Sequence, residues 1–331
     1  ASITLDNIRK DKTIWSNSES ALIDLGDGIL NFEFRSKMNS LGGGVLEGLN
    51  KSIDIAEKDY RGLVVGNQSD NFSVGANLAM VMMMAVEQDW YELNMAINLF
   101  QQTSMKLRYS SIPVIAAPFG MTLGGGCEFS MHSDKIVAAA ETYIGLVEVG
   151  VGLIPGGGGT KEFALRALKG ALPDDVKTNH LRNYFMNIAT AKVATSAHEA
   201  KQMGILTDKD IIVVNKDRQI AEAKRQAIVL DELGYTPPVP EKIKVLGKES
   251  MGMFYVGTDQ MVAGGYASEH DRLIANKIGY VMTGGNLSEP TEVSEQYLLD
   301  LEREAFLSLC GERKTLERIQ TMLTTGKPLR N

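Results

Sequence analysis

Cysteine and basic charge are both scarce in this sequence. Only two cysteines, Cys127 and Cys310, occur among its 331 residues, and neither belongs to a CxxC motif or a Cys/His cluster. This excludes a disulfide framework and a cysteine-based zinc site, and it fits the reducing cytoplasm. Asp and Glu number 41 against 34 for Lys and Arg, and no basic run could track a phosphate backbone. We therefore expect neither a metal site nor a nucleic-acid partner.

Long apolar runs are also missing. The longest uncharged stretch of interest, residues 109–127, contains Pro113, Pro118 and four glycines, which suits a strand and a turn better than a membrane helix. We expect no membrane span. The opening residues, ASITLDNIRKDK, lack the apolar core of a signal peptide and an initiator Met. We therefore expect a chain that was processed or cut from a longer protein.

Nucleotide-binding fingerprints are absent as well. A GxGxxG motif that starts at Gly124 would need glycine where Phe129 stands, and one that starts at Gly42 would need it where Glu47 stands. The pattern GxxxxGK[ST] does not occur either. These absences argue against a nicotinamide site and a nucleoside triphosphate site.

Glycine is the one residue in excess, with 33 copies. Ten of them fall in three runs, at residues 42–44, 124–126 and 156–159. Ordinary side chains separate these runs, so the glycines indicate local turns with a permissive backbone and not a flexible linker.

Short apolar segments alternate with helical patterns between residues 21 and 140, which predicts an α/β protein. We expect a helix that starts near Gly125 or Gly126, directly after the GMTLGG turn. Beyond residue 160 the pattern is mostly helical, and the TPPVP segment at 236–240 marks a boundary. The other expected strands are 21–26, 28–34, 63–67, 113–117 and 135–140, and the other expected helices include 43–57, 88–108, 258–280 and 293–324.

Two glycine-containing turns could present backbone N–H groups to an anion. In the first, Gly124, Gly125 and Gly126 precede Glu128 at the expected start of a helix, where N–H groups point outward. The alternative is a packed turn in which Glu128 only favours the helix N-terminus. In the second, SVGAN at 73–77 could add the N–H of Ala76, or could be an ordinary loop between strand and helix.

Two further features leave alternatives open. Glu148 stands among Leu, Val and Ile, so it either points to solvent or lies in a dry pocket that raises its pKa. If it converged with Glu128, the two carboxyl groups could hold and activate a water molecule. A methionine-rich run at 80–84 suits either core packing or a fatty acyl tunnel.

Taken together and in order, these segments resemble the crotonase (enoyl-CoA hydratase/isomerase) family. The matching segments are SVGANL, IPVIAAPFGMTLGGGCEFSMHSD, YIGLVEVGVGLIPGGGGT and ATSAHEAKQMGIL, and the resemblance covers about residues 20–215. The opening LGDGILNFEFRSKMNSLG looks most like the hydratase portion of multifunctional fatty-acid oxidation proteins, which also carry 3-hydroxyacyl-CoA dehydrogenase.

The resemblance implies a crotonase-like spiral of ββα units with a mostly helical C-terminal region. We expect a linker or extension at 1–20, the crotonase core at 21–215, and a C-terminal region at 216–331 that mediates trimerisation and covers the active site. A homotrimer or hexamer is implied, and the leucine-rich face at 293–310 would help to form it. A fused or associated 3-hydroxyacyl-CoA dehydrogenase is a further expected partner.

The resemblance also assigns roles to residues. It implies Glu128 and Glu148 as the catalytic pair and the N–H groups of Ala76 and Gly125 as the oxyanion hole. Two positions depart from the family pattern, which usually has Asp where Asn77 stands and Pro where Val147 stands. From the resemblance we expect the first departure to affect contacts on the adenine side and the second to affect the direction in which the Glu148 side chain points. Residues implied in substrate binding are Val74, Asn77, Leu78, Gly124 and Gly126.

The implied reaction is hydration of trans-2-enoyl-CoA to 3-hydroxyacyl-CoA in fatty-acid β-oxidation. It needs no metal or redox cofactor, because coenzyme A is part of the substrate. One alternative is Δ3,Δ2-enoyl-CoA isomerisation, which requires only one carboxylate. Another is a catalytically silent module that binds acyl-CoA, since a fold does not determine a function.

Overall fold

The computed structural model describes residues 2–331 and divides into two compact units. Unit 1 consists of the residues up to Asn77 together with Leu99–Gly145 and Val193–Val239. Unit 2 consists of Leu78–Asn98, Leu146–Lys192 and Pro240–Asn331. Each unit therefore combines segments from distant parts of the sequence.

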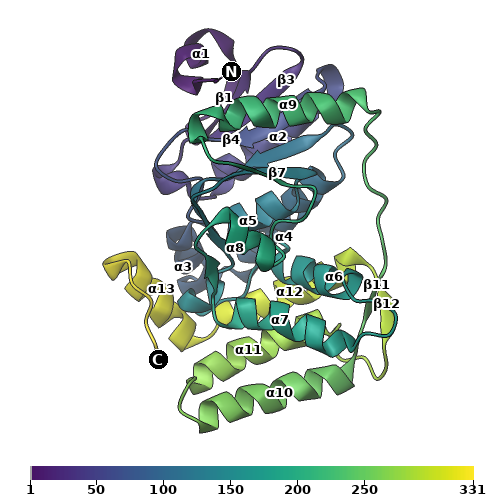
Figure 1. The fold of residues 1–331 in the computed structure, drawn as a ribbon. Coiled ribbons are helices and arrows are strands. Elements are labelled where there is room, and N and C mark those ends of the chain that lie inside the picture. The colour runs from purple at the N-terminus through teal and green to yellow at the C-terminus, as the bar shows by residue number, and fades with distance from the viewer. Residues whose placement is uncertain (1) are drawn as a thin grey trace. The chain divides into compact units, whose positions relative to one another are not determined.

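A seven-stranded sheet forms the centre of unit 1 (Figure 1). Its first three strands pair antiparallel, and the pairs from β3 onward are parallel. The expected strands between residues 21 and 140 are confirmed. In spatial order the strands are β1 (Thr13–Ser16), β2 (Ser20–Asp24), β3 (Ile29–Phe34), β4 (Gly62–Gly66), β5 (Val114–Ala117), β7 (Lys135–Ala139) and β10 (Ile211–Val213).

Apolar clusters cover both faces of this sheet, as parallel strands require. On one face, α2 (Gly43–Asp59) buries Val45, Leu46, Leu49 and Ile53 at the three- and four-residue spacing of an amphipathic helix. On the other face, α9 (Gln219–Glu232) packs Ile220 and Ala223 against the strands, and Figure 1 shows it lying across them. The sheet is a buried frame that holds the loops at its strand ends.

A second, three-stranded sheet in unit 1 consists of β6 (Gly120–Leu123), β8 (Thr142–Gly145) and β9 (Val193–Ala194). The sequence predicted a turn at 120–123, and this is wrong. The segment is a strand because it pairs in parallel with β8, a partner that a local pattern does not reveal.

The shorter elements of unit 1 are η1 (Lys37–Asn39), α5 (Gly125–Met131), α8 (Ala197–Gln202) and η3 (Lys216–Arg218). Helix α4 (Trp90–Arg108) begins in unit 2 and ends in unit 1.

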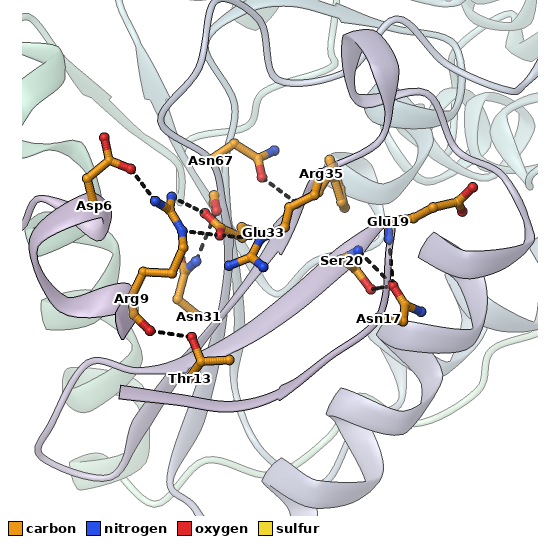
Figure 2. A network of polar contacts seen from close by, with 12 residues as sticks. Asp6, Arg9, Thr13, Asn17, Glu19, Ser20, Asn31, Glu33, Arg35 and Asn67 are labelled. Atoms are coloured by element: carbon orange, nitrogen blue, oxygen red, sulfur yellow. Dashed lines mark hydrogen bonds and ion pairs between the residues drawn. The ribbon is translucent and has the colours of Figure 1, made fainter. Parts of the chain in front are cut away.

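The first twenty residues pack against the rest of unit 1. Helix α1 (Leu5–Lys12) buries Leu5, and β1 extends the large sheet. Arg9 donates from Nε and Nη2 to the two oxygens of buried Glu33, at 2.7 and 3.0 Å, and Figure 2 shows this clamp beside Asp6 and Arg35. Residues 216–239 also belong to unit 1. The roles predicted for 1–20, 21–215 and 216–331 stay predictions.

Unit 2 is mostly helical. Its elements are α3 (Leu78–Val86), η2 (Glu148–Val151), α6 (Gly159–Lys169), α7 (Lys177–Ala189), α10 (Lys248–Ala263), α11 (Glu269–Met282), α12 (Glu295–Cys310) and α13 (Arg313–Thr325), with β11 (Ile243–Val245) and β12 (Thr291–Val293) paired antiparallel. The predicted helix at 258–280 is broken at Gly264 and Gly265, because Gly265 has φ +76°. Ser268 then starts α11 with a capping box. The predicted helix at 293–324 is likewise two helices, separated at Gly311.

Two expectations about apolar side chains are wrong. Leu298, Leu299 and Leu309 of α12 are already buried within the chain, so they do not require a second copy. None of the methionines at 80–84 is buried, and α3 buries only Val81 and Ala85. The methionine run is therefore not core packing, and its use as an acyl tunnel stays a prediction.

Candidate active site

Helix α5 starts at Gly125, as the glycine run predicts. Gly124 precedes it with φ +55°, a backbone conformation that favours glycine. The first helical hydrogen bond runs from the Glu128 N–H to the Gly124 carbonyl at 3.0 Å. The N–H of Gly125 therefore lies ahead of the helical hydrogen-bond ladder, at the end of the helix where the dipole favours negative charge.

The glycines of this turn are required for packing within the chain. A Cβ at Gly125 would lie 2.5 Å from Phe100 Cζ and 2.7 Å from Leu41 Cδ1. A Cβ at Gly126 would lie 3.0 Å from Ser73 Cβ. The turn is therefore tightly packed on the side to which a Cβ would project, and the role of its N–H groups stays a prediction.

The loop at 73–77 presents the N–H of Ala76 away from Leu41, with which it forms an isolated parallel bridge. The Leu41 N–H donates to the Gly75 carbonyl at 2.8 Å, and the Asn77 N–H donates to the Leu41 carbonyl at 3.3 Å. In a parallel bridge of this kind, the residue between the two bonded positions turns its own N–H to the opposite side. That residue is Ala76, which is exposed.

Gly75 brings this loop against the α5 turn. It has φ +96°, and a Cβ there would lie 3.0 Å from the Leu123 carbonyl oxygen and 3.5 Å from the Gly125 nitrogen. The loop that carries Ala76 and the turn that carries Gly125 are therefore neighbours within unit 1. Val74 is half-buried beside them, and the Asn77 side chain lies near Gly42 at the start of α2.

Asn39 and Ser73 hold this loop, and the sequence did not single them out. Asn39 has φ +54° and donates from Nδ2 to Ser69 Oγ at 3.0 Å and to the Asn71 carbonyl at 2.9 Å. Ser73 Oγ donates to the Asn39 carbonyl at 2.7 Å and accepts from the Gly75 N–H at 3.1 Å. The only available signal was that asparagine tolerates a left-handed conformation.

Glu128 stands on α5, three residues after Gly125, and is only 2% exposed. Residues three apart lie on the same side of a helix. The carboxyl group thus belongs to the same short helix whose first N–H is the candidate oxyanion donor.

Glu148 opens η2 in unit 2. It is half-buried, and its Oε2 is shielded from solvent, so the interpretation as a fully solvated carboxylate does not hold. Glu148 stands three residues after Gly145, the last residue of β8. Gly145 accepts from the Gly124 N–H at 2.9 Å and pairs with Leu123 in the β6–β8 ladder. Leu78, the remaining predicted binding residue, starts α3 in unit 2.

Other kinds of site find little support in the part of the chain described. Within residues 2–331, no cluster of three or more His, Cys, Asp or Glu side chains is placed to hold a metal ion. Over the same range, no helix has both the length and the apolar character that a membrane crossing requires. Both cysteines are buried, and burial raises the pKa of Cys310 to about 12.

Comparisons with known proteins identify the family of the chain. The family model described as enoyl-CoA hydratase/isomerase matches residues 26–226. A Bacillus subtilis protein named probable 3-hydroxyacyl-CoA dehydrogenase is 48% identical over 99% of this chain and 41% of its own length. A Rickettsia felis putative fatty acid oxidation complex trifunctional enzyme is 29% identical over 96% of this chain and 41% of its own length. The chain spans about two-fifths of the length of these relatives.

Solved structures support the fold. A Bacillus halodurans enoyl-CoA hydratase superposes with a TM-score of 0.61 at 15% identity, covering 92% of this chain and all of that one. An enoyl-CoA hydratase/isomerase from Xanthobacter autotrophicus gives 0.59 at 17% identity, with 94% and 95% covered. The predicted α/β crotonase fold is confirmed. Together with the family match over more than half of its residues, this establishes that the chain belongs to the enoyl-CoA hydratase/isomerase family.

Proposed function

We propose that the protein is an enoyl-CoA hydratase, which adds water to trans-2-enoyl-CoA and forms 3-hydroxyacyl-CoA. The proposal depends mainly on one observation: the Ala76 loop and the Gly125 turn are adjacent, and Glu128 follows on the same helix. The names of the relatives in fatty-acid oxidation support the setting in β-oxidation.

In the proposed reaction, the oxygen of water attacks C3 of the enoyl thioester while Glu128 takes a proton from that water. The electrons of the double bond move toward the thioester carbonyl, whose oxygen gains negative charge. The N–H groups of Ala76 and Gly125 stabilise this oxygen, and they do so most strongly in the transition state. Glu148 then delivers a proton to C2, so one carboxyl starts ionised and the other protonated.

The substrate is an acyl-CoA thioester, and the proposed chemistry uses no metal or redox cofactor. Val74, Asn77, Leu78, Gly124 and Gly126 flank the proposed donors in sequence and would contact the substrate. The partly exposed methionines of α3 offer an adaptable apolar surface for the acyl chain.

Isomerisation of Δ3-enoyl-CoA to the Δ2 isomer is the second candidate. The observation that favours it is that Glu128 lies in unit 1 together with both N–H donors. One carboxylate suffices for this proton shuttle. A silent acyl-CoA-binding module is distinguished from both by tight binding without turnover.

We also propose a cytoplasmic homotrimer or hexamer that is fused to, or associated with, a 3-hydroxyacyl-CoA dehydrogenase. The name of the B. subtilis relative and the two-fifths coverage of its length support the association. Exposed Met253, Val256 and Tyr266 in and after α10 offer apolar surface for assembly. Light scattering at micromolar concentration tests the oligomer, and a monomeric mass would contradict it.

The loss of enoyl-thioester absorbance on adding purified protein to crotonyl-CoA tests the reaction. We expect rapid loss with the wild type and with Cys127→Ser, and very slow loss with Glu128→Gln. Conversion of a 3-enoyl-CoA without hydration of crotonyl-CoA would favour the isomerase. Binding without either reaction would favour the silent module.

A further inference from the structure

Helix α13 contacts the backbone of the turn that carries Glu148. Arg318 Nη1 donates to the Val149 carbonyl at 3.1 Å, and Thr315 Oγ1 donates to the Gly152 carbonyl at 2.7 Å. The approach is close, because a Cβ at Gly152 would lie 2.7 Å from Thr315 Cα. Both carbonyls belong to the four residues that follow Glu148, and all these groups lie in unit 2.

The turn is a short 3-10 helix. It consists of the four residues Glu148–Val151, and its backbone bonds run from the Gly150 N–H to Val147, from the Gly152 N–H to Val149 and from the Leu153 N–H to Glu148. Such turns have poorer hydrogen-bond geometry than an α-helix and are used in short pieces. An anchor from outside the turn therefore has a strong influence on where the Glu148 side chain points.

Arg318 is itself held in place by burial and by several hydrogen bonds. It is 2% exposed, and a buried guanidinium needs partners for its donors. Nη2 donates to Asp271 Oδ1 at 2.8 Å, and Nε donates to Asn331 Oδ1 at 2.7 Å. Burial raises the pKa of Asp271, but the Ser268 amide and Arg318 outweigh burial and hold that pKa below its ordinary value. The ion pair fixes the direction in which Nη1 points at Val149.

Thr315 is oriented by a second buried group. Because its hydroxyl hydrogen goes to Gly152, its oxygen accepts from His270 Nε2, at 2.9 Å. The proton on His270 is therefore on Nε2. Burial, and then the positive charge of Arg318, lower the pKa of His270, which keeps the ring neutral near pH 7. Glu312 and Asp271 oppose this lowering, and Lys314 adds to it.

We infer that Thr315 and Arg318 are positioning residues for Glu148, acting through the carbonyls of Val149 and Gly152. This role rests on the proposed function of Glu148 as the proton donor to C2. The side chain of Arg318 is 3% exposed and that of Asp271 is 33% exposed. Such an ion pair is weak evidence for stability, so we assign to it the geometry that it fixes. Thr315 and Arg318 stand one turn apart on α13, so one helix face supplies both bonds.

The test compares crotonyl-CoA hydration by full-length variants. Thr315→Val keeps the β-branched shape and removes the hydroxyl, whereas Thr315→Ser keeps the hydroxyl. Arg318→Gln removes the charge, and Arg313→Gln is a matched control, because Arg313 is 91% exposed and pairs with Glu317 on its own helix. Misplacing a reacting group by about 1 Å can cost on the order of 100-fold in rate.

We expect kcat to fall at least ~10-fold in Thr315→Val and Arg318→Gln, whereas KM should change less than about 2-fold. The pKa that limits kcat in its pH profile should also shift in both variants. Thr315→Ser and Arg313→Gln should stay close to the wild type. If Arg318→Gln does not fold, Thr315→Val alone decides the matter. Wild-type hydration combined with an unchanged kcat and pH profile in folded Thr315→Val overturns the positioning role. No hydration by the wild type overturns the proposed function itself, and the positioning role with it.

Discussion

The two halves of the proposed catalytic machinery are held in place in different ways. In unit 1, backbone hydrogen bonds at Leu41 and tight glycine contacts at Gly75 and Gly125 fix the donor N–H groups. In unit 2, side chains 163 and 169 residues further along the chain hold the carbonyls that follow Glu148. The proposed donors are therefore held by backbone contacts among three short segments, whereas the proposed acid depends on side chains that lie far along the chain.

Removing either carboxyl group should lower the hydration rate more than any other change. Glu128→Gln and Glu148→Gln each take away a proton-transfer group, and such groups contribute about 10²–10⁴-fold to the rate. The double variant should be little worse than either single one, because the two groups act as a unit on one water molecule. Steady-state hydration with circular dichroism as a folding check measures this, and near-wild-type turnover in either variant would refute its role.

Adding bulk at the α5 turn should damage the backbone-held half. Gly125→Val would place its side chain against Phe100 and Leu41 and shift the N–H donor. Loss of one oxyanion donor costs about 2.7–4 kcal/mol in the barrier, so kcat should fall about 100-fold or more. Gly125→Ala is the milder variant if valine prevents folding, and Cys127→Ser, two residues on, is the control. A folded Gly125→Val enzyme with wild-type kcat would mean that the site is misplaced.

Asp134 in unit 1 should make the free energy of unfolding depend on pH. Burial raises its pKa to about 6, although the Val114 amide and the Tyr235 hydroxyl, each at 2.8 Å, favour its charged form. Because the folded pKa lies above the ordinary value of 3.8, the stabilisation is complete below about pH 4 and is lost as pH rises through 6. The loss is roughly 2–3 kcal/mol.

Asp134→Asn should therefore flatten the pH dependence of the free energy of unfolding between pH 4 and 7. The amide can still accept from Val114, and it can donate to the Tyr235 hydroxyl, which also donates to the Ser110 carbonyl. Urea unfolding at a series of pH values measures the slope. A slope identical to that of the wild type would contradict the assignment to Asp134.

The smallest effect should come from Asn39, which supports the Ala76 loop. Both Asn39→Ala and Asn39→Gly lose the amide contacts to Ser69 and Asn71, but only alanine is strained at φ +54°. Alanine should be less stable than glycine by about 1 kcal/mol in urea unfolding. A more stable alanine variant would show that the backbone conformation is not what limits this position.

The sequence predicted the elements whose signals are local. The strand at 63–67, the helix at 43–57 and the start of α5 at Gly125 all follow from apolar spacing or glycine placement, and all are confirmed. The failures have two causes. Strand β6 exists because a distant strand, β8, pairs with it. The breaks at Gly264–Gly265 and Gly311 are marked locally by glycine, but an apolar pattern that continues on both sides hides them.

The same distinction applies to the candidate site. The motif residues Ala76, Gly125 and Glu128 could be proposed from short segments because one strand, one turn and one helix position them. Arg318 and Thr315 could not, because nothing near them in the sequence identifies Val149 or Gly152 as their partners. The burial of Arg318 is apparent only in the structure.

The absorbance spectrum of a bound substrate analogue distinguishes the contribution of the N–H donors from that of Glu148 most directly. Cinnamoyl-CoA absorbs at longer wavelength when hydrogen bonds polarise its thioester carbonyl, so its red shift on binding measures the N–H donors without any reaction. We predict a similar red shift with the wild type and with Glu148→Gln, and a lost or much smaller one with folded Gly125→Val. No red shift with the wild type, or a full red shift with Gly125→Val, would contradict the assignment of the oxyanion hole to Ala76 and Gly125.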